Sequence, residues 1–362
     1  MRKIVTVLGA RPQFIKASVV SDALTKTHGL REVVVHTGQH FDANMSEVFF
    51  TELGMAPPTY QLDIHGGHHG EMTGRMLIET ERVLLTEKPD MVLVYGDTNS
   101  TLAGALAAAK LHIPVAHVEA GLRSFNMHMP EEINRILTDR ISSWLFAPTA
   151  AASRHLAAEG LAPHRVHVVG DVMYDVALYF GARIDAHGGP VQRLGLEPAG
   201  YVLATVHRAE NTDEPERLAA IVDGLAAVSA DIRVVWPLHP RTRAVLQQTG
   251  RYQSLAQQVT LIDPVGYLDM VQLEKHAALI ATDSGGVQKE AFFYQVPCVT
   301  LRAETEWVEL VDSGWNLLVP PSSAELVAQS VLGAIGSRGR DVRPYGDGQA
   351  AQAIAEILGS QI

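Results

Sequence analysis

Acidic side chains that can carry out acid–base chemistry gather in the first half of the chain. Asp97 and Glu119 each follow a short apolar run that predicts a buried strand, and Glu131 and Glu132 open a predicted helix further along. In open α/β sheets the ligand binds at the carboxyl ends of the strands. We therefore expect three carboxylates to converge on one cleft, where different environments can separate their pKa values into an acid and a base. Each acid taken alone equally fits a helix cap or a turn.

The first predicted strand-to-helix turn places two cations where a phosphate can bind. Gly9-Ala10 ends the strand, and a helix begins near Pro12. Arg11 in the turn can bind a phosphate through two hydrogen bonds, and Lys16 in the helix can bind it as a point charge. The turn lacks the pattern of a Walker A loop. Lys16 equally fits a solvated helix face.

A second phosphate site is predicted in the other half of the chain. Ser284 can cap a helix there, and Gly285 and Gly286 leave their backbone amides open to an approaching phosphate. Glu290, two turns into that helix, is within reach of a ribose. An ordinary capped helix after a glycine turn explains the same residues. His207 ends another predicted strand and can transfer a proton, bind a diphosphate, or make a plain polar contact.

The elements that carry these residues alternate between strand and helix, which is typical of parallel βαβ units. In the first half the predicted strands are Ile4–Leu8, Val33–His36, Met91–Tyr95, Val115–Val118, Leu145–Ala147 and Val166–Val169, with helices at Asn44–Leu53, Ser100–Lys110, Pro130–Ile141 and Ala150–Glu159. In the second half the predicted strands are Tyr201–Val206, Arg233–Pro237, Val259–Ile262, Ala278–Thr282 and Pro297–Leu301, with helices at Leu218–Val228, near Tyr267–Glu274 and at Val287–Phe293.

The predicted fold is α/β, with two doubly wound Rossmann-like lobes. We place the N-terminal lobe at 1–175 and the C-terminal lobe at 176–345, and interpret the glycine- and proline-rich stretch 181–200 as a linker region. A length of 362 residues favours two domains.

Composition excludes several classes of protein. The net charge is −11, with 40 acidic against 29 basic residues, which argues against a nucleic-acid or membrane-surface binder. The single cysteine, Cys298, excludes an internal disulfide and fits a buried strand. No apolar run reaches the length of a membrane span, so a cytoplasmic location is expected. His65, His68 and His69 suggest a metal site, but they lack a cysteine partner, and a mobile polar loop is the expected alternative.

Taken in order, several segments resemble the non-hydrolysing UDP-N-acetylglucosamine 2-epimerases. These segments are GARPQFIK, TGQH, GDTNSTLAGALAA, HVEAGLRS, PEEINR, TVHRAEN, TDSGGVQKEA and TEWVEL, and they extend over residues 1 to about 320. The ordered set is far more specific than any single piece. The resemblance implies a glycosyltransferase-B-like fold with the ligand cleft between the lobes, and a last helix within 346–362 that packs back on the first lobe.

The resemblance also implies a reaction and a set of roles. The reaction inverts C2 of a UDP-linked 2-acetamido sugar, UDP-N-acetylglucosamine to UDP-N-acetylmannosamine, by eliminating UDP to a 2-acetamidoglucal and adding it back. It uses no cofactor and no metal, and a homodimer is expected. The implied catalytic residues are Asp97, Glu119, Glu131 and His207, with Asp97 favoured as the base. The implied UDP-binding residues are Arg11, Lys16, His207, Ser284, Gly285, Gly286, Glu290 and Arg302.

The chain departs from the usual family pattern at two places. Trp307-Val308 stands where members acting on UDP-N-acetylglucosamine usually have Arg-Pro, and Asp42 replaces a glutamine of a segment linked to allosteric activation. These departures resemble the branch that acts on UDP-2,3-diacetamido-2,3-dideoxyglucuronate. On that hypothesis Arg123, His128 or Arg208 binds the sugar carboxylate. A retaining glycosyltransferase and a non-catalytic nucleotide-sugar binder are the alternatives that the sequence leaves open.

Overall fold

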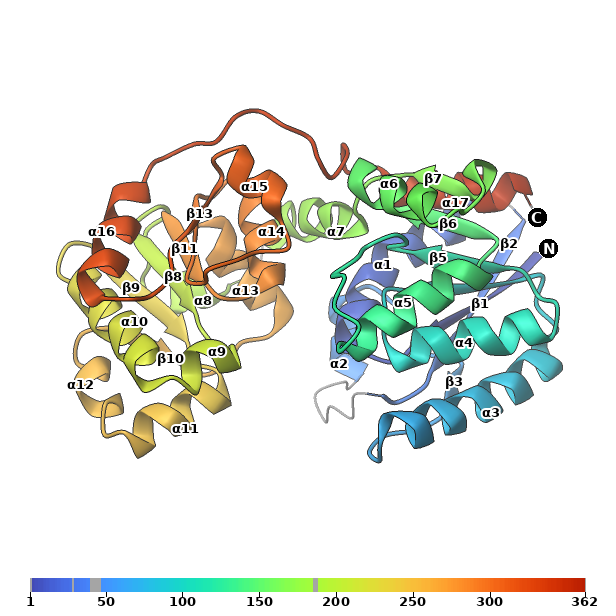
Figure 1. Cartoon of the computed structure of the whole chain (residues 1–362), viewed down its shortest axis with the longest axis horizontal. Coiled ribbons are helices and arrows are strands. Elements are labelled where there is room, and N and C mark those ends of the chain that lie inside the picture. The colour runs from blue at the N-terminus through green and yellow to red at the C-terminus, as the bar shows by residue number, and fades with distance from the viewer. Residues whose placement is uncertain (1, 28, 40–46, 185–187, 362) are drawn as a thin grey trace. The chain divides into compact units, whose positions relative to one another are not determined.

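The computed structural model describes residues 2–27, 29–39, 47–184 and 188–361, and the chain forms two compact units. The first unit comprises Met1–Val176 together with Arg343–Ile362, and the second comprises Ala177–Val342. Figure 1 labels the helices and strands of both.

The first unit is built on a parallel sheet of seven strands in the order β3-β2-β1-β4-β5-β6-β7. The strands are β1 (Arg2–Leu8), β2 (Leu30–His36), β3 (Tyr60–Gln61), β4 (Met91–Tyr95), β5 (Val115–Val118), β6 (Trp144–Ala147) and β7 (Val166–Val168). Every residue of β4 and β5 is buried. Strands buried on both faces have near-continuous apolar runs, which is why the sequence predicts their bounds so closely.

Helices cover both faces of this sheet, as a doubly wound fold requires. They are α1 (Arg11–Lys26), α2 (Glu47–Glu52), α3 (His69–Glu87), α4 (Asn99–Lys110), α5 (Pro130–Ile141), α6 (Ala150–Ala158), α7 (Val172–Gly181) and α17 (Ala350–Gln361), with a 3-10 turn at Pro163–Arg165. Helices α3, α4 and α5 pack side by side, and α1 packs against α17 (Figure 1).

The second unit repeats the plan with a parallel sheet of six strands in the order β10-β9-β8-β11-β12-β13. Its strands are β8 (Tyr201–Thr205), β9 (Arg233–Pro237), β10 (Thr260–Ile262), β11 (Leu279–Thr282), β12 (Cys298–Thr300) and β13 (Asn316–Leu318). Its helices are α8 (Pro190–Arg193), α9 (Ala209–Thr212), α10 (Pro215–Val228), α11 (Pro240–Gln248), α12 (Tyr252–Ala256), α13 (Tyr267–Lys275), α14 (Gly285–Phe293), α15 (Val308–Asp312) and α16 (Ala324–Ala334).

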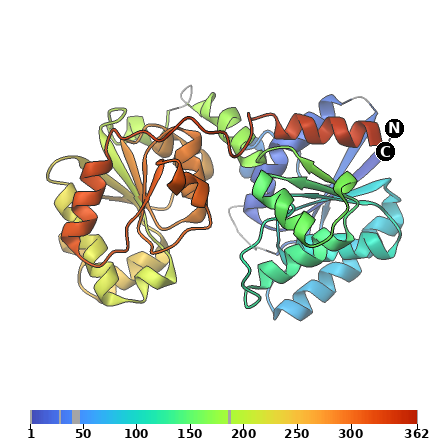
Figure 2. The ribbon, with the colours of Figure 1, turned by 45° about the horizontal axis from the view of Figure 1, so that its top comes forward.

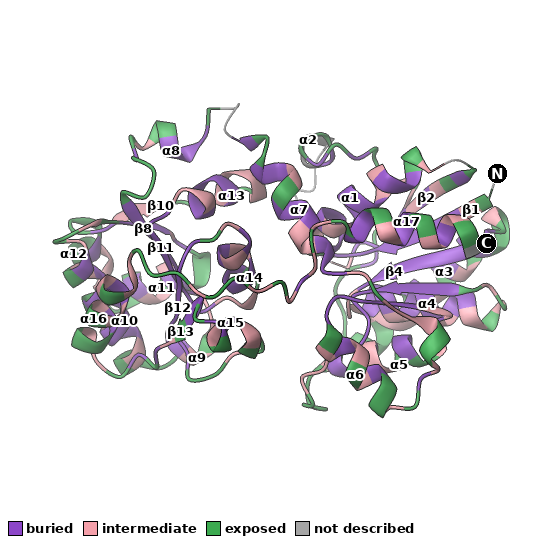
Figure 3. Cartoon of the chain, turned by 90° about the horizontal axis from the view of Figure 1, so that it is seen from above, coloured by how far each residue is buried: buried purple, intermediate pink, exposed green. Residues whose placement is uncertain are grey.

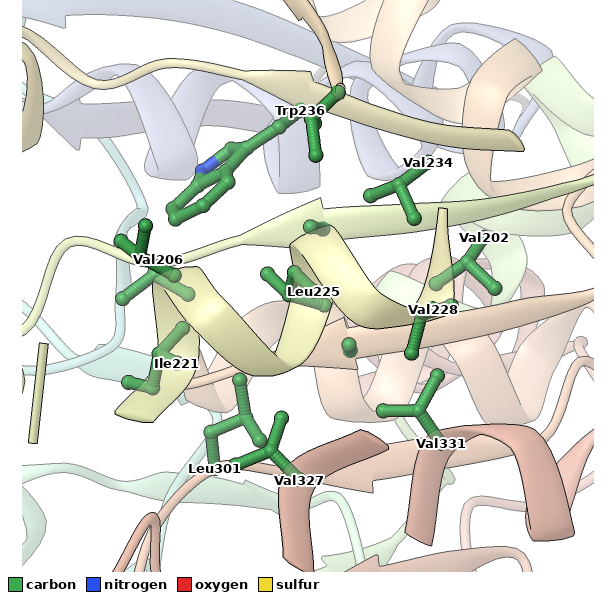
Figure 4. Close-up of a cluster of buried hydrophobic side chains, with 14 of the residues drawn as sticks. Val202, Val206, Ile221, Leu225, Val228, Val234, Trp236, Leu301, Val327 and Val331 are labelled. Carbon is green, nitrogen blue, oxygen red and sulfur yellow. The ribbon is translucent and has the colours of Figure 1, made fainter. Parts of the chain in front are cut away.

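Helices α10 and α16 enclose the main apolar core of the second unit. Figure 4 shows Leu225 on α10 and Val327 on α16 in one cluster with the strand residues Val202 and Trp236. All four side chains are buried, and burial of this kind supplies about 1.5–3 kcal/mol for each large apolar side chain. In Figure 3 the central strands of both units are purple, whereas the helices show green on their outer sides. The α/β fold class with two doubly wound sheets is therefore confirmed.

The last helix, α17, is anchored to the first unit by specific polar contacts as well as by packing. The Asp175 carboxylate accepts hydrogen bonds from the backbone amides of Ala350 (3.1 Å) and Ala351 (2.7 Å) at the start of α17. At the other end, an Arg2 guanidinium nitrogen donates to the Gly359 carbonyl (3.0 Å). Figure 2 shows α17, in red, lying along the first unit. The chain thus returns to its first unit after completing the second.

Burial of the Asp175 carboxyl predicts a pH dependence for this anchor. Burial raises its pKa from 3.8 to about 6 despite the backbone donors. Because the folded-state pKa lies above the unfolded one, folding favours the protonated carboxyl, and this contribution is lost as the pH rises from about 4 through 6. We expect the loss to reach about 3 kcal/mol. Hydrogen-exchange protection of α17, corrected for intrinsic rates, should therefore fall with pH more steeply in the wild type than in Asp175→Asn. Equal slopes would contradict this assignment.

Two local expectations from the sequence differ from the structure. Residues 181–200, expected as a linker, belong to the second unit and contain α8, while the division between the units falls inside α7, which was not predicted. The histidine-rich segment, expected as a mobile loop, is helical from His69 onward. Glycines do not prevent a helix when a buried face such as that of Met76 holds it in place. Of the predicted helix Asn44–Leu53, residues 44–46 lie outside the described residues.

One further expectation is met. Cys298 is buried in β12, as the sequence predicts. Within the described part of the chain, no helix is both long and apolar enough to cross a bilayer.

Candidate active site

The carboxyl ends of β1 and β4 form the switch point of the first sheet. These strands are neighbours, although the chain runs outward from β1 to β3 and returns through α3 before it forms β4. The turn after β1 leads into Arg11, and the turn after β4 carries Asp97. Ligands of doubly wound sheets bind where the strand order reverses in this way. The structure therefore places both predicted residues at the expected edge.

Gln13 holds these two turns together, a role that the sequence did not suggest. Its side-chain oxygen accepts hydrogen bonds from the amides of Gly9 (2.8 Å) and Ala10 (3.0 Å), and its nitrogen donates to the Tyr95 carbonyl (2.7 Å). Gly9 allows the close approach, because a Cβ there would lie 1.9 Å from the Ser100 hydroxyl. The turn after β1 is thereby fixed against the end of β4.

Glu119 and Lys16 form a buried ion pair at this edge. Glu119 follows β5 with a positive φ of 70°, which is unusual for a residue with a side chain, and only 6% of that side chain is exposed. Its carboxylate contacts the Lys16 ammonium. Burial lowers the pKa of Lys16, but the Glu119 carboxylate, together with Asp171 and Asp97, outweighs that effect, so the pKa is raised overall. Lys16 is thus a fixed cation rather than part of a solvated helix face.

Asp97 is paired with Arg135 from α5. The Asp97 carboxylate contacts one terminal nitrogen of the Arg135 guanidinium, and the other lies 3.0 Å from Glu132. The Asp97 backbone carbonyl accepts a hydrogen bond from the Asn134 side chain (2.9 Å). About a third of the Asp97 side chain (31%) remains exposed, so a substrate can reach it. Arg135 is a site residue that the sequence analysis did not identify.

The two glutamates at the start of α5 differ in their surroundings. Glu131 is exposed. Glu132 is buried, and its carboxylate accepts hydrogen bonds from the amides of Ser124 and Phe125, both at 2.9 Å. Burial raises the pKa of Glu132, yet these donors and Arg135 lower it overall. Glu132 therefore holds the loop after β5, while Glu131 is open to a ligand.

Arg123 is engaged inside the first unit and is not available for a sugar carboxylate. Only 1% of its side chain is exposed. The guanidinium contacts Glu159 at 2.6 and 2.8 Å and Asp139 at 2.8 Å. A substrate carboxylate would have to displace both acids, so this part of the carboxylate hypothesis is wrong. His128 is exposed and Arg208 is partly exposed.

In the second unit a buried aspartate organises the turns at the switch point between β8 and β11. The Asp283 carboxylate accepts hydrogen bonds from the backbone amides of His207 (3.0 Å) and Arg208 (2.9 Å) and from the side chain of Asn211 (3.0 Å). Asp283 itself is fully buried. Asp283 thus fixes these two turns to each other. Gln13 does the same for the turns after β1 and β4 in the first unit.

His207 is the part of this arrangement that faces outward. Its side chain is 40% exposed, and its Nδ1 lies 3.7 Å from the Asp283 carboxylate. The His239 ring lies 5.4 Å away between centroids. Burial, with contributions from His239 and Arg208, lowers the pKa of His207, although Asp283 opposes the change. A neutral imidazole next to bound phosphates can donate a hydrogen bond or transfer a proton.

Ser284, Gly285 and Gly286 follow β11 and lead into α14. Ser284 occupies the N-cap position, but its side chain makes no capping hydrogen bond, contrary to expectation, and its amide instead donates to the Thr282 hydroxyl (2.9 Å). The Trp307 indole donates to the Gly285 carbonyl (2.8 Å). The backbone amides of Gly285 and Gly286 lie at the start of α14, where a helix dipole favours an anion, and their binding of a phosphate stays a prediction. Glu290 lies in the second turn of α14 and is partly exposed.

Arg302 is held by two carboxylates beside this turn. Its side chain is 5% exposed and contacts Glu210 (2.8 Å) and Glu306 (3.1 Å). Burial lowers the pKa of Arg302, and the two acids raise it overall. Burial raises the pKa of Glu306, but Arg302 and, to a smaller extent, Arg208 lower it overall. Two arginines, Arg302 and Arg208, and the two acids therefore surround the turn. Of the two arginines, Arg302 is buried and Arg208 is partly exposed.

Metal binding finds no support in the described part of the chain. No group of three histidine, cysteine, aspartate or glutamate side chains is arranged there to hold an ion. His69 instead lies 3.2 Å from the Asn99 side chain at the start of α4. Of the segment around Gln39, His40 and Asp42 lie outside the described residues.

The fold and these clusters are those of a nucleotide-sugar enzyme with two Rossmann-like units. The sequence profile of the UDP-N-acetylglucosamine 2-epimerase family matches residues 22–359. The chain therefore belongs to that family.

Individual relatives agree with this assignment. UDP-2,3-diacetamido-2,3-dideoxy-D-glucuronate 2-epimerase of Pseudomonas aeruginosa is 56% identical over 98% of this chain and 99% of its own length. The Methanocaldococcus jannaschii UDP-GlcNAc 2-epimerase in complex with UDP-GlcNAc and UDP superimposes with a TM-score of 0.85, at 45% identity and 99% coverage of both chains. The Neisseria meningitidis UDP-GlcNAc 2-epimerase bound to UDP-GlcNAc gives a TM-score of 0.86 at 31% identity, over 99% of this chain and 100% of that one.

Proposed function

We propose that this chain epimerises C2 of a UDP-linked 2-acetamido sugar by eliminating UDP and adding it back to a 2-acetamidoglucal. The observation that carries the proposal is the pair of acids at the carboxyl edge of the first sheet, Asp97 after β4 next to Arg135 and Glu119 after β5 next to Lys16. The C2 proton is only weakly acidic, so its removal requires a positioned base. The family assignment supports the same chemistry.

The first unit would carry the proton chemistry. Asp97 is the favoured base because it is the more exposed of the two acids and its carboxylate is oriented by its contact with Arg135. Glu119 is nearly buried, so its pair with Lys16 serves to stabilise charge that develops on the sugar and the departing oxygen. The exposed Glu131 remains a proposed assisting acid.

The second unit would bind UDP. Amides at the start of α14, with Ser284, would bind the diphosphate, and His207 would donate to it. Glu290, in the second turn of α14, would bind the ribose. Arg302 would act mainly by holding the acids around this turn, because its side chain is almost fully buried. Arg11, at the start of α1, is a proposed phosphate contact.

We propose the 2,3-diacetamido uronate as the preferred sugar, with N-acetylglucosamine as the second candidate. The relative named for the uronate is 56% identical, against 45% for a relative named for UDP-N-acetylglucosamine. Trp307, which departs from the usual family motif, donates a hydrogen bond to the Gly285 carbonyl in the turn proposed to bind the diphosphate. Both sugars undergo the same bond changes, so this choice concerns specificity alone.

Incubation of the purified protein with each UDP-sugar tests the proposal. Formation of the C2 epimer, identified by its proton NMR couplings, is expected with no added acceptor, cofactor or metal. UDP release that requires an acceptor would favour the glycosyltransferase alternative. Binding of both sugars without any turnover would favour a non-catalytic binder.

Replacing Arg208 by alanine should discriminate between the two sugars. Arg208 is partly exposed beside His207, whereas Arg123 is buried and fully paired. If Arg208 binds the sugar carboxylate, its loss removes a charged hydrogen bond worth about 1.5–3 kcal/mol, a fall of about 10–150-fold in kcat/KM for the uronate. The neutral sugar should lose much less. Equal losses for both sugars would show that Arg208 serves the common part of the substrate.

We further propose a homodimer, formed through an apolar surface on the first unit. This α5 surface consists of exposed apolar side chains on α5 and the loop before it, namely Phe125 (74% exposed), Met127 (59%), Met129 (37%), Ile133 (41%) and Leu137 (47%). Large exposed apolar side chains that cluster in this way mark interaction sites. A second copy is the occupant that the family resemblance favours. The cytoplasmic location remains a prediction.

The variant Ile133→Asp/Leu137→Asp should shift the protein from dimer to monomer in sedimentation velocity. Both side chains lie on the exposed side of α5, so the substitutions should leave the fold intact. Leu326→Asp on α16, also an exposed leucine, is the matched control and should not alter the sedimentation coefficient. A dimer that survives the double substitution would place the interface elsewhere.

A further inference from the structure

A fully buried histidine links the turns that carry the two acids of the first unit. His117 lies on β5, and its side chain has 0% exposure. Its Nδ1 lies 2.7 Å from the Asp139 carboxylate on α5. Its Nε2 lies 2.7 Å from the backbone carbonyl of Gly96, the residue between β4 and Asp97. None of the roles assigned above uses this histidine.

The two partners define the state of the ring. A carboxylate oxygen and a peptide carbonyl oxygen can only accept hydrogen bonds, so both contacts form together only when both ring nitrogens carry protons. The ring thus bridges Asp139 and the Gly96 carbonyl through its two nitrogens. The buried Asp139 carboxylate is tolerated because it is paired and hydrogen-bonded.

The pair continues outward as a chain of alternating charges. Asp139 also contacts the Arg123 guanidinium (2.8 Å), which in turn contacts Glu159 (2.6 Å). The side chains of Asp139 and Arg123 are at most 1% exposed, and Glu159 is 29% exposed at the surface end. Each ion in the chain thus has an oppositely charged neighbour, which fixes its orientation in the interior.

Asp139 holds the turn after β5 as well as the one after β4. Its second carboxylate oxygen accepts a hydrogen bond from the Gly121 amide (3.1 Å). Gly121 is two residues beyond Glu119, and Gly96 is directly before Asp97. The Gly96 amide also donates to the Val118 carbonyl (2.9 Å). The backbone amide and the backbone carbonyl of Gly96 are therefore both bound by residues of β5. Both acids therefore depend on the same buried pair for their backbone positions.

We propose that His117, held as an imidazolium by Asp139, is a positioning residue that sets the geometry of Asp97 and Glu119 for removal of the C2 proton. The inference rests on the proposed function, because it assigns a role within that reaction. A misplacement of a base by about 1 Å can cost about 10²-fold in rate. Loss of the pair should therefore lower kcat while UDP binding by the second unit is unchanged.

Substitution of the pair tests the role. His117→Gln keeps one donor group, the amide NH2, in place of two donor nitrogens on opposite sides of a ring, and it cannot be charged. Asp139→Asn removes the opposite charge with little change of shape. Each should lower kcat for C2 exchange by at least about 10-fold at an unchanged Kd for UDP, and the double variant should lose no more than the worse single one. His167→Gln on β7 is the matched control, since it removes a histidine from the same sheet away from the acids, and it should leave kcat unchanged.

Wild-type kcat in His117→Gln, or losses of the two single variants that add in the double variant, would overturn the inference. If the variants fail to fold, the wild type still decides. In the wild type, ¹⁵N-histidine NMR at pH 7.5 should show one ring with both nitrogens protonated, assigned to His117 through its neighbours Asp139 and Gly96. A neutral ring at His117 would overturn the inference. If the wild type shows no C2 exchange at all, the proposed function fails, and that result is distinct from either outcome for His117.

Discussion

Replacing Asp97 by asparagine should reduce kcat for epimerisation by about 10²–10⁴-fold, the usual contribution of a general base. Asparagine keeps the shape of the side chain but cannot accept the C2 proton. It also loses the charge that pairs with Arg135, while the Asp97 backbone contact with Asn134 is unaffected by the change. Initial rates, together with calorimetric titration of UDP, would show a loss in turnover with an unchanged Kd.

Asp90→Asn is the matched control for this substitution. Asp90 lies just before the amino end of β4, the same strand that leads to Asp97, and its carboxylate accepts a hydrogen bond from the Lys3 amide (2.7 Å). It should retain full kcat. A retained kcat in Asp97→Asn as well would remove Asp97 from the list of bases and leave Glu119 and Glu131 as candidates.

Separating Lys16 from Glu119 should cost both stability and activity. Lys16→Met leaves the Glu119 carboxylate buried without its ammonium partner, a change that typically costs about 3–5 kcal/mol. Glu119→Gln leaves the ammonium in excess, although Asp97 and Asp171 partly compensate its charge. We expect each single variant to lose at least about 10²-fold in kcat. Urea unfolding and initial rates measure the two effects.

The double variant Lys16→Met/Glu119→Gln distinguishes a catalytic pair from a structural one. It should recover much of the stability lost in Lys16→Met, because no uncompensated charge remains, but it should remain inactive. Lys3→Met, which breaks a partly buried pair with Glu87 (2.9 Å) at the other end of the sheet, controls for the loss of an ion pair alone. Recovery of activity in the double variant would show that the pair only stabilises the fold.

The fold could be predicted from the sequence because its strands are buried on both faces. The predicted bounds of β4, β5 and α5 coincide with the observed ones, and the apolar runs Met91–Tyr95 and Val115–Val118 leave little ambiguity. Short edge strands such as β3 and β13 were not predicted, since two or three residues carry no clear period.

The positions of the site residues on strand ends could also be predicted, but their partners could not. Strand ends follow from local pattern, whereas the contact between His117 and Gly96 depends on the register that pairs His117 with Val94. Likewise, nothing local to Arg123 shows that it is buried between Asp139 and Glu159. These contacts join residues far apart in the chain and become apparent only in the folded sheet.

One signal in the sequence does point to the buried network. Helix α5 has polar side chains on its inner side, including Glu132 and Asp139, and apolar ones on its outer side, including Ile133 and Leu137. This is the reverse of an ordinary surface helix. Such an inverted pattern indicates a polar site beneath the helix and an interaction surface above it, in agreement with the two roles proposed for α5.

Exchange of the C2 proton with solvent tests the central proposal most directly. The wild-type protein would be incubated in D2O with each UDP-sugar, and the C2 proton followed by NMR. Elimination and re-addition through a solvent-exposed base predicts deuterium at C2 in the epimer formed and, with time, in the remaining substrate. Epimerisation that retains the original hydrogen at C2, or an absence of exchange with both sugars, would contradict the proposed chemistry.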